Sequence, residues 1–215
     1  MTKEKNFLDI DLSNNNMNGY KANYLSRVFG IFYEDLIKHC WGTEGYILLG
    51  RPSVYDKNKR YKTYDYMVEK DRKRFIVEAK CYVAYEDFKH IELTLELLKK
   101  WDKTSGKKFP DKDAFQFFLE LGTKREPYEE YTFFYTDKDG KKSAFEPTGK
   151  ILIWARVKKG EDEKKKIKEE YNFSDLFSVE DMMNKNKNKK NDAYYQYILN
   201  RKKWTDELFK KLLGE

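Results

Sequence analysis

Two acids and a lysine on one short segment are the residues of this chain best suited to chemistry. Asp65 is followed, after twelve intervening residues, by Glu78 and then by Lys80. Two carboxylates held together at an apolar sheet repel each other and lose hydration, unless a proton or a cation lies between them. Carboxylate oxygens suit Mg²⁺, which keeps several waters and often adds phosphate oxygens of a substrate. A lysine beside that ion can orient or deprotonate a water during hydrolysis of a phosphodiester.

Two strands joined by a polar turn are expected to position these residues. The strands are residues 64–69 and 74–81, both rich in aromatic and branched apolar side chains. Antiparallel pairing through the turn places Asp65 opposite Glu78, with about 5 Å between their Cβ atoms. Alternation along the second strand puts Glu78 and Lys80 on one face. Since both faces carry apolar residues, we expect the hairpin to lie buried within a sheet.

An acid two residues before a lysine is a common pattern in so charged a chain. It also occurs at Asp71–Lys73, Asp87–Lys89, Asp139–Lys141, Asp162–Lys164 and Glu163–Lys165. Only the pair Glu78 and Lys80 lies in an apolar strand with an acid at the opposing hairpin position. The alternative interpretation is a hairpin at the edge of the sheet, in which Lys80 simply pairs with Glu78 or Asp65.

The succession of Asp65 and then Glu78-Ala79-Lys80 resembles the PD-(D/E)XK nuclease superfamily, which includes many restriction endonucleases and the Holliday junction resolvases. The proline of that motif is replaced here by Tyr64, and the resemblance covers residues 25–101. It implies a restriction-endonuclease-like α/β fold, with a mixed central sheet flanked by helices. It also implies catalysis by Asp65, Glu78 and Lys80 with Mg²⁺, for which Mn²⁺ can substitute. We expect Asp65, Glu78 and the backbone carbonyl of Ala79 to bind the metal.

Helices are expected before and after the hairpin. Residues 20–40 and 85–101 each carry an apolar stripe at helical spacing, and residues 46–50 are expected to form the first strand. Glu34 lies at the margin of the first stripe. The resemblance implies that an acid near this place joins the metal site, and Asp35 competes with Glu34 for that role.

The second half of the chain predicts further strands and a helical C-terminal elaboration. Residues 131–136 and 142–146 flank an Asp/Gly turn and should form a hairpin, whose lysine-bearing tip either enters a DNA groove or is an ordinary sheet edge. Residues 150–157 are expected to form a central strand. Residues 178–181 resemble a capping box that opens a short helix, and residues 192–213 predict a final helix.

Length and composition favour one domain that acts on a polyanion. With 215 residues, we expect a flexible segment at 1–19 and a single nuclease domain at 20–215, divided into a core (20–158) and a C-terminal elaboration (159–215). The net charge of +7 fits double-stranded DNA as partner. No stretch has the apolar character of a signal peptide or a membrane span. We therefore expect a cytoplasmic protein without membrane contact.

These features predict a metal-dependent DNA endonuclease. Asp65, Glu78 and Lys80 should carry catalysis, with Glu34 assisting. The segments beyond the minimal core favour a sequence-specific restriction enzyme of type II character, and such enzymes often act as homodimers. A structure-specific repair or recombination nuclease, similar to Holliday junction resolvases, is one alternative. A nucleic-acid-binding protein without catalysis is the other.

Overall fold

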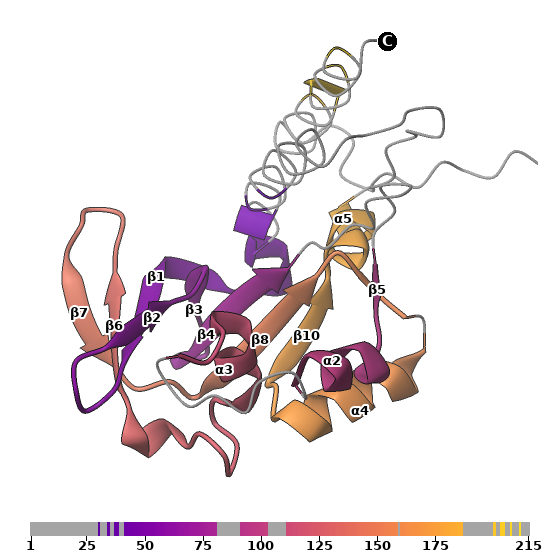
Figure 1. Cartoon of the computed structure of the whole chain (residues 1–215). Helices are drawn as coiled ribbons and strands as arrows, with labels where there is room; N and C mark the ends of the chain where they lie inside the picture. Colours follow the sequence, from indigo (N-terminus) through magenta and orange to yellow (C-terminus); the bar gives the residue numbers. More distant parts are fainter. Residues whose placement is uncertain are drawn as a thin grey trace, which may run out of the picture.

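One central sheet organises a mixed α/β fold (Figure 1). The computed structural model describes residues 41–80, 91–102, 111–158 and 160–186, and the single residues 30, 34, 37, 38, 200, 203, 204, 207 and 211. The eight-stranded sheet has the order β10-β8-β4-β3-β1-β6-β7, with β2 paired to β1. Strands β4, β8 and β10 run parallel, and the other pairs are antiparallel. The strands are β1 (Ile47–Tyr55), β2 (Tyr61–Thr63), β3 (Tyr66–Lys70), β4 (Lys73–Lys80), β6 (Thr132–Thr136), β7 (Lys142–Phe145), β8 (Gly149–Trp154) and β10 (Asp175–Ser178).

The predicted hairpin, β3 with β4, lies in the middle of this sheet. Its turn residues Asp71 and Arg72 have φ angles of 51° and 61°. Two positive φ angles define the hairpin turn whose twist matches the twist of the strands. Met67 pairs with Ile76, and both side chains are fully buried. The structure thus confirms the expected register from Met67 to Glu69 and the buried position of the hairpin, whereas the ladder ends at Tyr66 and Val77, before the expected pair of Asp65 and Glu78.

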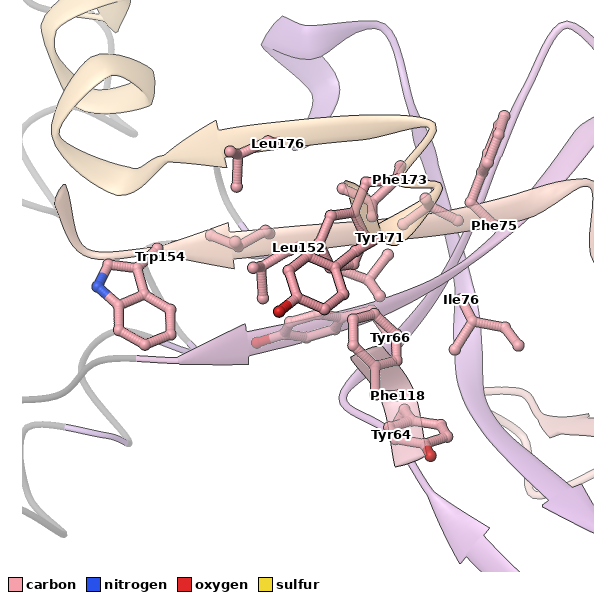
Figure 2. Packing of buried hydrophobic residues seen from close by; sticks show 14 of the residues in the cluster. Tyr64, Tyr66, Phe75, Ile76, Phe118, Leu152, Trp154, Tyr171, Phe173 and Leu176 are labelled. Carbon is pink, nitrogen blue, oxygen red and sulfur yellow. The ribbon is translucent and has the colours of Figure 1, made fainter. Parts of the chain in front are cut away.

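Within the described part of the chain, three helices cover the face of the sheet that carries Glu78 and Lys80. Lys80 and Trp154 are neighbours across the parallel pair β4 and β8, so their side chains share this face. The Trp154 ring contacts Trp101 and Phe115, with centroids 5.4 and 6.2 Å away. Figure 2 shows Trp154 at the end of its strand, together with other aromatic side chains of the core such as Tyr64 and Phe118. The helices are α2 (Leu95–Asp102), α3 (Ala114–Glu120) and α4 (Glu161–Tyr171).

The opposite face of the sheet is covered by η1 and α5, which are far apart in the sequence. Trp41, in the 3-10 helix η1 (Trp41–Glu44), meets the rings of Tyr66 and Phe177 at 6.3 and 6.0 Å. Helix α5 (Val179–Asn186) contacts η1. Ile37, one of the described helical residues of the predicted 20–40 helix, is buried. Most of that predicted helix lies outside the described residues.

Two buried lysines hold α3 in place over the sheet. Lys150 of β8 is fully buried and donates hydrogen bonds to the carbonyls of Phe118 and Leu119, at 2.8 and 2.6 Å. Burial holds the pKa of Lys150 well below its ordinary value. Lys112 forms ion pairs with Glu120 and, at 3.0 Å, with Glu126. Both lysines therefore fix the last turn of this short helix through buried polar contacts.

Two predicted elements have different ends in the structure. The strand expected at 150–157 leaves the sheet after Trp154, and β9 (Arg156–Val157) pairs instead with β5 (Glu92–Leu93). The helix expected at 85–101 begins only at Leu95, because Thr94 caps it by accepting a hydrogen bond from Leu97 N at 3.1 Å. Residues 81–90 lie outside the described part of the chain.

The other predictions for the second half have mixed outcomes. Hairpin β6 and β7 is confirmed, as is the capping box, in which Ser178 Oγ accepts a hydrogen bond from Asp181 N at 3.3 Å. Strands β2 and β10, helix α3 and the 3-10 helix η2 (Tyr128–Glu130) were not expected from the sequence. The final helix predicted at 192–213 lies largely outside the described residues. Among those described, no helix is long and apolar enough to cross a membrane.

Gly50 marks an irregular pairing between β1 and β3 and yields a stability prediction. A Cβ atom at this position would lie 2.2 Å from the carbonyl oxygen of Thr136, where backbone cannot yield cheaply. We expect Gly50→Ala to lower the free energy of unfolding by about 2 kcal/mol in urea denaturation. Gly42→Ala is the matched control, since a Cβ there would meet nothing within 4 Å. Equal effects of the two substitutions would contradict the close approach at Gly50.

Candidate active site

Asp65 lies where the chain passes from β2 to β3, at one end of the hairpin. The last ladder pair of the hairpin is Tyr66 with Val77. Beyond it, the Oδ2 atom of Asp65 accepts a hydrogen bond from Ala79 N at 2.8 Å. The carboxylate thus takes the place that a backbone carbonyl would have in a longer ladder. This contact draws Asp65 against β4, beside Glu78.

Glu78 is the most deeply buried acid of this group, with 4% of its surface exposed. Its Oε1 atom forms an ion pair with Lys80 Nζ on the same face of the strand. Burial raises the pKa of Glu78 to about 7; the nearby charge of Lys80 opposes this shift, and the charge of Asp65 adds to it. The positive charge of Lys80 therefore does not fully offset the cost of burying an ionised Glu78 at neutral pH.

Lys80 ends β4 with its ammonium at the border between the core and solvent. The side chain is 25% exposed, and Nζ lies 5.5 Å from the ring centroid of Phe115. The backbone is fixed, since its carbonyl accepts a hydrogen bond from Ala155 N at 3.2 Å. A fixed stem with a partly exposed amine can reach a group that arrives from solvent.

Ala79 can offer a third oxygen to a cation. In a strand, the N–H and C=O of one residue point to the same side. Because Ala79 N–H points to Asp65, its carbonyl also points toward the β3 side of the strand. Two carboxylates and one carbonyl form a small set of hard oxygen ligands. Within the described part of the chain, no group of three or more His, Cys, Asp and Glu side chains could hold a metal.

The carboxylate of Glu34 is not shown near the oxygen atoms of Asp65, Glu78 and Ala79. The residue is helical and exposed, and its backbone carbonyl, rather than its carboxylate, contacts the sheet by accepting a hydrogen bond from Tyr66 OH at 3.2 Å. The Tyr66 side chain lies on the face that Trp41 covers, opposite to the face of Glu78. Asp35, the competing candidate, lies outside the described residues.

Helix α3 supplies neighbours of the site that sequence reasoning missed. Tyr64 is buried, donates from its hydroxyl to the carbonyl of Ala114 at 3.3 Å, and contacts Phe118, as Figure 2 shows. Burial, with a smaller contribution from the charge of Glu78, raises the pKa of Tyr64 well above its ordinary value. Asp113 caps the helix by accepting a hydrogen bond from Phe115 N at 2.8 Å. An Asp before the run Ala-Phe-Gln-Phe-Phe-Leu was the available signal.

A cation also lies near Asp65. Arg51 on β1 is exposed, and its Nε donates a hydrogen bond to the carbonyl of Tyr64 at 3.3 Å. Tyr64 directly precedes Asp65, so the guanidinium of Arg51 lies next to the β2–β3 connection that carries Asp65. The two acids and the lysine thus lie on β4 and the β2–β3 connection, against α3, and Arg51 of β1 contacts only the backbone of that connection.

Comparisons with protein families, with curated proteins and with solved structures find no match to this chain. A function for this chain therefore rests on its own residues and their geometry.

Proposed function

We propose that this chain is a Mg²⁺-dependent nuclease that hydrolyses phosphodiester bonds in double-stranded DNA. The observation that carries the proposal is the contact of Asp65 with the backbone of Ala79, beside the buried pair of Glu78 and Lys80. That contact brings two acids, a backbone carbonyl and an amine together at one end of a buried hairpin. The PD-(D/E)XK pattern implies the same set of groups.

The oxygen atoms around Asp65 and Glu78 fit Mg²⁺ by their chemistry. Mg²⁺ commonly binds one or two carboxylates and fills its other positions with water and substrate phosphate oxygens. Asp65 accepts a hydrogen bond from Ala79 N through Oδ2, and its carboxylate lies close enough to Glu78 to raise the pKa of that acid further. The raised pKa of Glu78 fits a site whose negative charge a divalent ion would compensate. Bound there, Mg²⁺ would polarise the phosphate and lower the pKa of a water.

The residues of the chain have distinct roles in this proposal. Asp65 and Glu78 place the oxygen ligands, and the core around β4 keeps them fixed. Lys80 forms an ion pair with Glu78, and its 25% exposed side chain can turn toward an incoming phosphate or nucleophilic water. There it orients the water and offsets the negative charge that develops at phosphorus. Glu34 stays a prediction for an accessory role.

The arrangement of elements supports a restriction-endonuclease-like fold. We assign the described helical residues 30, 34, 37 and 38, the hairpin of β3 and β4, and helix α2 to the core helix, hairpin and following helix of that fold. Strands β6, β7 and β10 and helices α4 and α5 lie beyond that core. Because these additions enlarge the surface available to DNA, we favour a sequence-specific, type II-like restriction enzyme that acts as a homodimer in the cytoplasm.

One observation favours a different class of function. The ion pair between Glu78 and Lys80 gives each of the two charges a partner without a metal ion. A protein in which this pair is only structural would bind nucleic acid with a steep dependence on salt and would not cleave it.

Incubation of the full-length chain with plasmid, linear duplex and branched DNA tests the proposal. Cleavage should require Mg²⁺ or Mn²⁺ and stop with EDTA. Discrete fragments from plain duplex support a restriction enzyme, whereas cutting confined to branched DNA supports a structure-specific nuclease. Glu78→Gln should be inactive, and Glu96→Gln, a change of an exposed acid on α2, is its control. Binding without any metal-dependent cleavage would reject the nuclease proposal.

A further inference from the structure

At the end of the sheet that Figure 1 shows farthest from α4 and α5, none of the described helices covers one of the two faces. Strands β2, β1, β6 and β7 are neighbours there. Their inward side chains, such as Val54 and Phe133, are buried, whereas the alternate side chains are exposed or only partly buried. From the strand registers, the outward residues are Arg51, Ser53, Tyr55, Tyr61, Thr63, Thr132, Phe134, Thr136, Lys142 and Ala144. We call these residues the open face.

Three aromatic rings lie together on the open face. Tyr61 pairs directly with Tyr55, and their rings stack with centroids 5.1 Å apart and planes at 24°. Phe134 meets Tyr55 edge-on at 5.6 Å. Tyr61 is 60% exposed. One side of its ring lies against Tyr55, so the other side is the open end of an aromatic stack. Outward positions of a half-covered antiparallel sheet are usually polar, which makes this stack unusual.

The open face is also positively charged. Lys142 Nζ lies 4.5 Å from the ring centroid of Tyr55 and 4.7 Å from that of Phe134, and it donates a hydrogen bond to Tyr55 OH at 2.8 Å. Arg51 is in the same row, separated from Lys142 only by Thr136. None of the described strand residues of the open face is acidic. The amine of Lys142 is thus held against the rings of Tyr55 and Phe134.

We propose that the open face binds single-stranded nucleic acid, with an unpaired base stacked on Tyr61 and the backbone phosphates against Lys142 and Arg51. Stacking platforms flanked by cations bind single strands because every unpaired base presents a flat face. A duplex hides these base faces in its own stack, so it would bind only through contacts of its phosphates with Lys142 and Arg51. The charge of the face selects a polyanion, and the free end of the aromatic stack selects unpaired bases.

This binding is separate from the proposed hydrolysis. Gly50 pairs with Met67, so Val54 and the other inward residues of β1 share the side of the sheet that carries Glu78. The open face is therefore on the opposite side from the two acids. Arg51 links the two regions, since it contacts the residue before Asp65. The inference adds a single-strand site to the chain and does not depend on cleavage.

Fluorescence anisotropy of the full-length chain in EDTA tests the inference. The probes are a labelled oligothymidylate and a duplex of equal length. Tyr61→Ala should weaken binding of the single strand roughly tenfold or more, from the loss of one stacked base, and should change duplex binding by less than about twofold. Tyr61→Phe keeps the ring and should bind like the wild type. Lys142→Met should weaken binding of both probes and lower the salt slope by about one.

A surface substitution outside the open face is the control for these variants. Ile47→Ala changes a 64% exposed residue of β1 and should leave both affinities unchanged. Single-strand binding that Tyr61→Ala leaves intact would overturn the inference, as would equal losses for the single strand and the duplex. Sedimentation that shows Tyr61→Ala disrupting a dimer, without an effect on single-strand binding, would identify the open face as a contact between copies and would also overturn it.

Discussion

Replacing Lys80 by methionine is expected to lower the rate of Mg²⁺-dependent DNA cleavage by about 10³-fold. A positioned proton-transfer group contributes about 10² to 10⁴ in rate, and a charge aimed at the transition state contributes a comparable factor. Methionine keeps an apolar, unbranched stem almost as long as that of lysine, and it removes the amine that lies near the Phe115 ring. Single-turnover cleavage by saturating enzyme measures the loss directly, and anisotropy in EDTA should show unchanged affinity for the duplex.

The ion pair complicates that experiment, because removing Lys80 leaves Glu78 buried without its cationic partner. The double variant Glu78→Gln with Lys80→Met removes both charges and so avoids an unpaired buried acid. It should fold with wild-type stability and still fail to cut. Lys165→Met on the exposed surface of α4 is the matched control and should cut normally. Cleavage by the double variant within about tenfold of the wild type would remove Lys80 and Glu78 from the mechanism.

The hairpin that carries the site could be predicted because its determinants are local. A turn of polar residues and an alternation of period two specify which residues face each other, and a slip by one residue would expose the apolar face. Met67 opposite Ile76 follows from those rules alone. The hydrogen bond from Ala79 N to Asp65 could not be predicted, because it depends on where the ladder ends.

The contacts around the hairpin depend on residues far apart in the sequence. Strand β8 lies parallel to β4 with more than sixty residues between them, and only tertiary packing selects that partner. The same packing ends β8 at Trp154, whose indole N–H donates to the carbonyl of Ile91 at 2.8 Å. Helix α3 has seven residues, which is too short for a reliable periodic pattern. Its position comes from Lys150 and Lys112, whose burial a hydropathy pattern does not suggest.

Glu78 is central to both the structural and the catalytic interpretation of the site. A buried acid whose pKa lies near 7 can hold a proton, an ammonium or a metal ion. The proton and the metal ion compete for the same oxygens. Lys80 is the internal partner that the chain itself provides. A structural role and a catalytic role therefore differ in how the stability of the protein responds to pH and Mg²⁺.

In the absence of metal, the free energy of unfolding should fall as the pH rises from about 5 to about 8. The pKa of Glu78 is about 7 in the folded protein, above its ordinary value of 4.5. The folded state therefore binds this proton more tightly than the unfolded state. The protonated Glu78 contributes its full stabilisation of the folded state below about pH 4.5, and this stabilisation is lost as the pH rises through 7. The shift corresponds to about 3 kcal/mol. Urea denaturation across this range measures it.

Glu78→Gln should remove this contribution, so the difference in stability between wild type and variant isolates it from other titrating groups. Mg²⁺ should stabilise the wild type more at about pH 8 than at about pH 6, because the ion binds the ionised acid and must displace its proton at the lower pH. The variant should show little stabilisation by Mg²⁺ at either pH. If the two proteins instead respond equally to Mg²⁺, the ion binds elsewhere, and the pair of Glu78 and Lys80 is a structural contact.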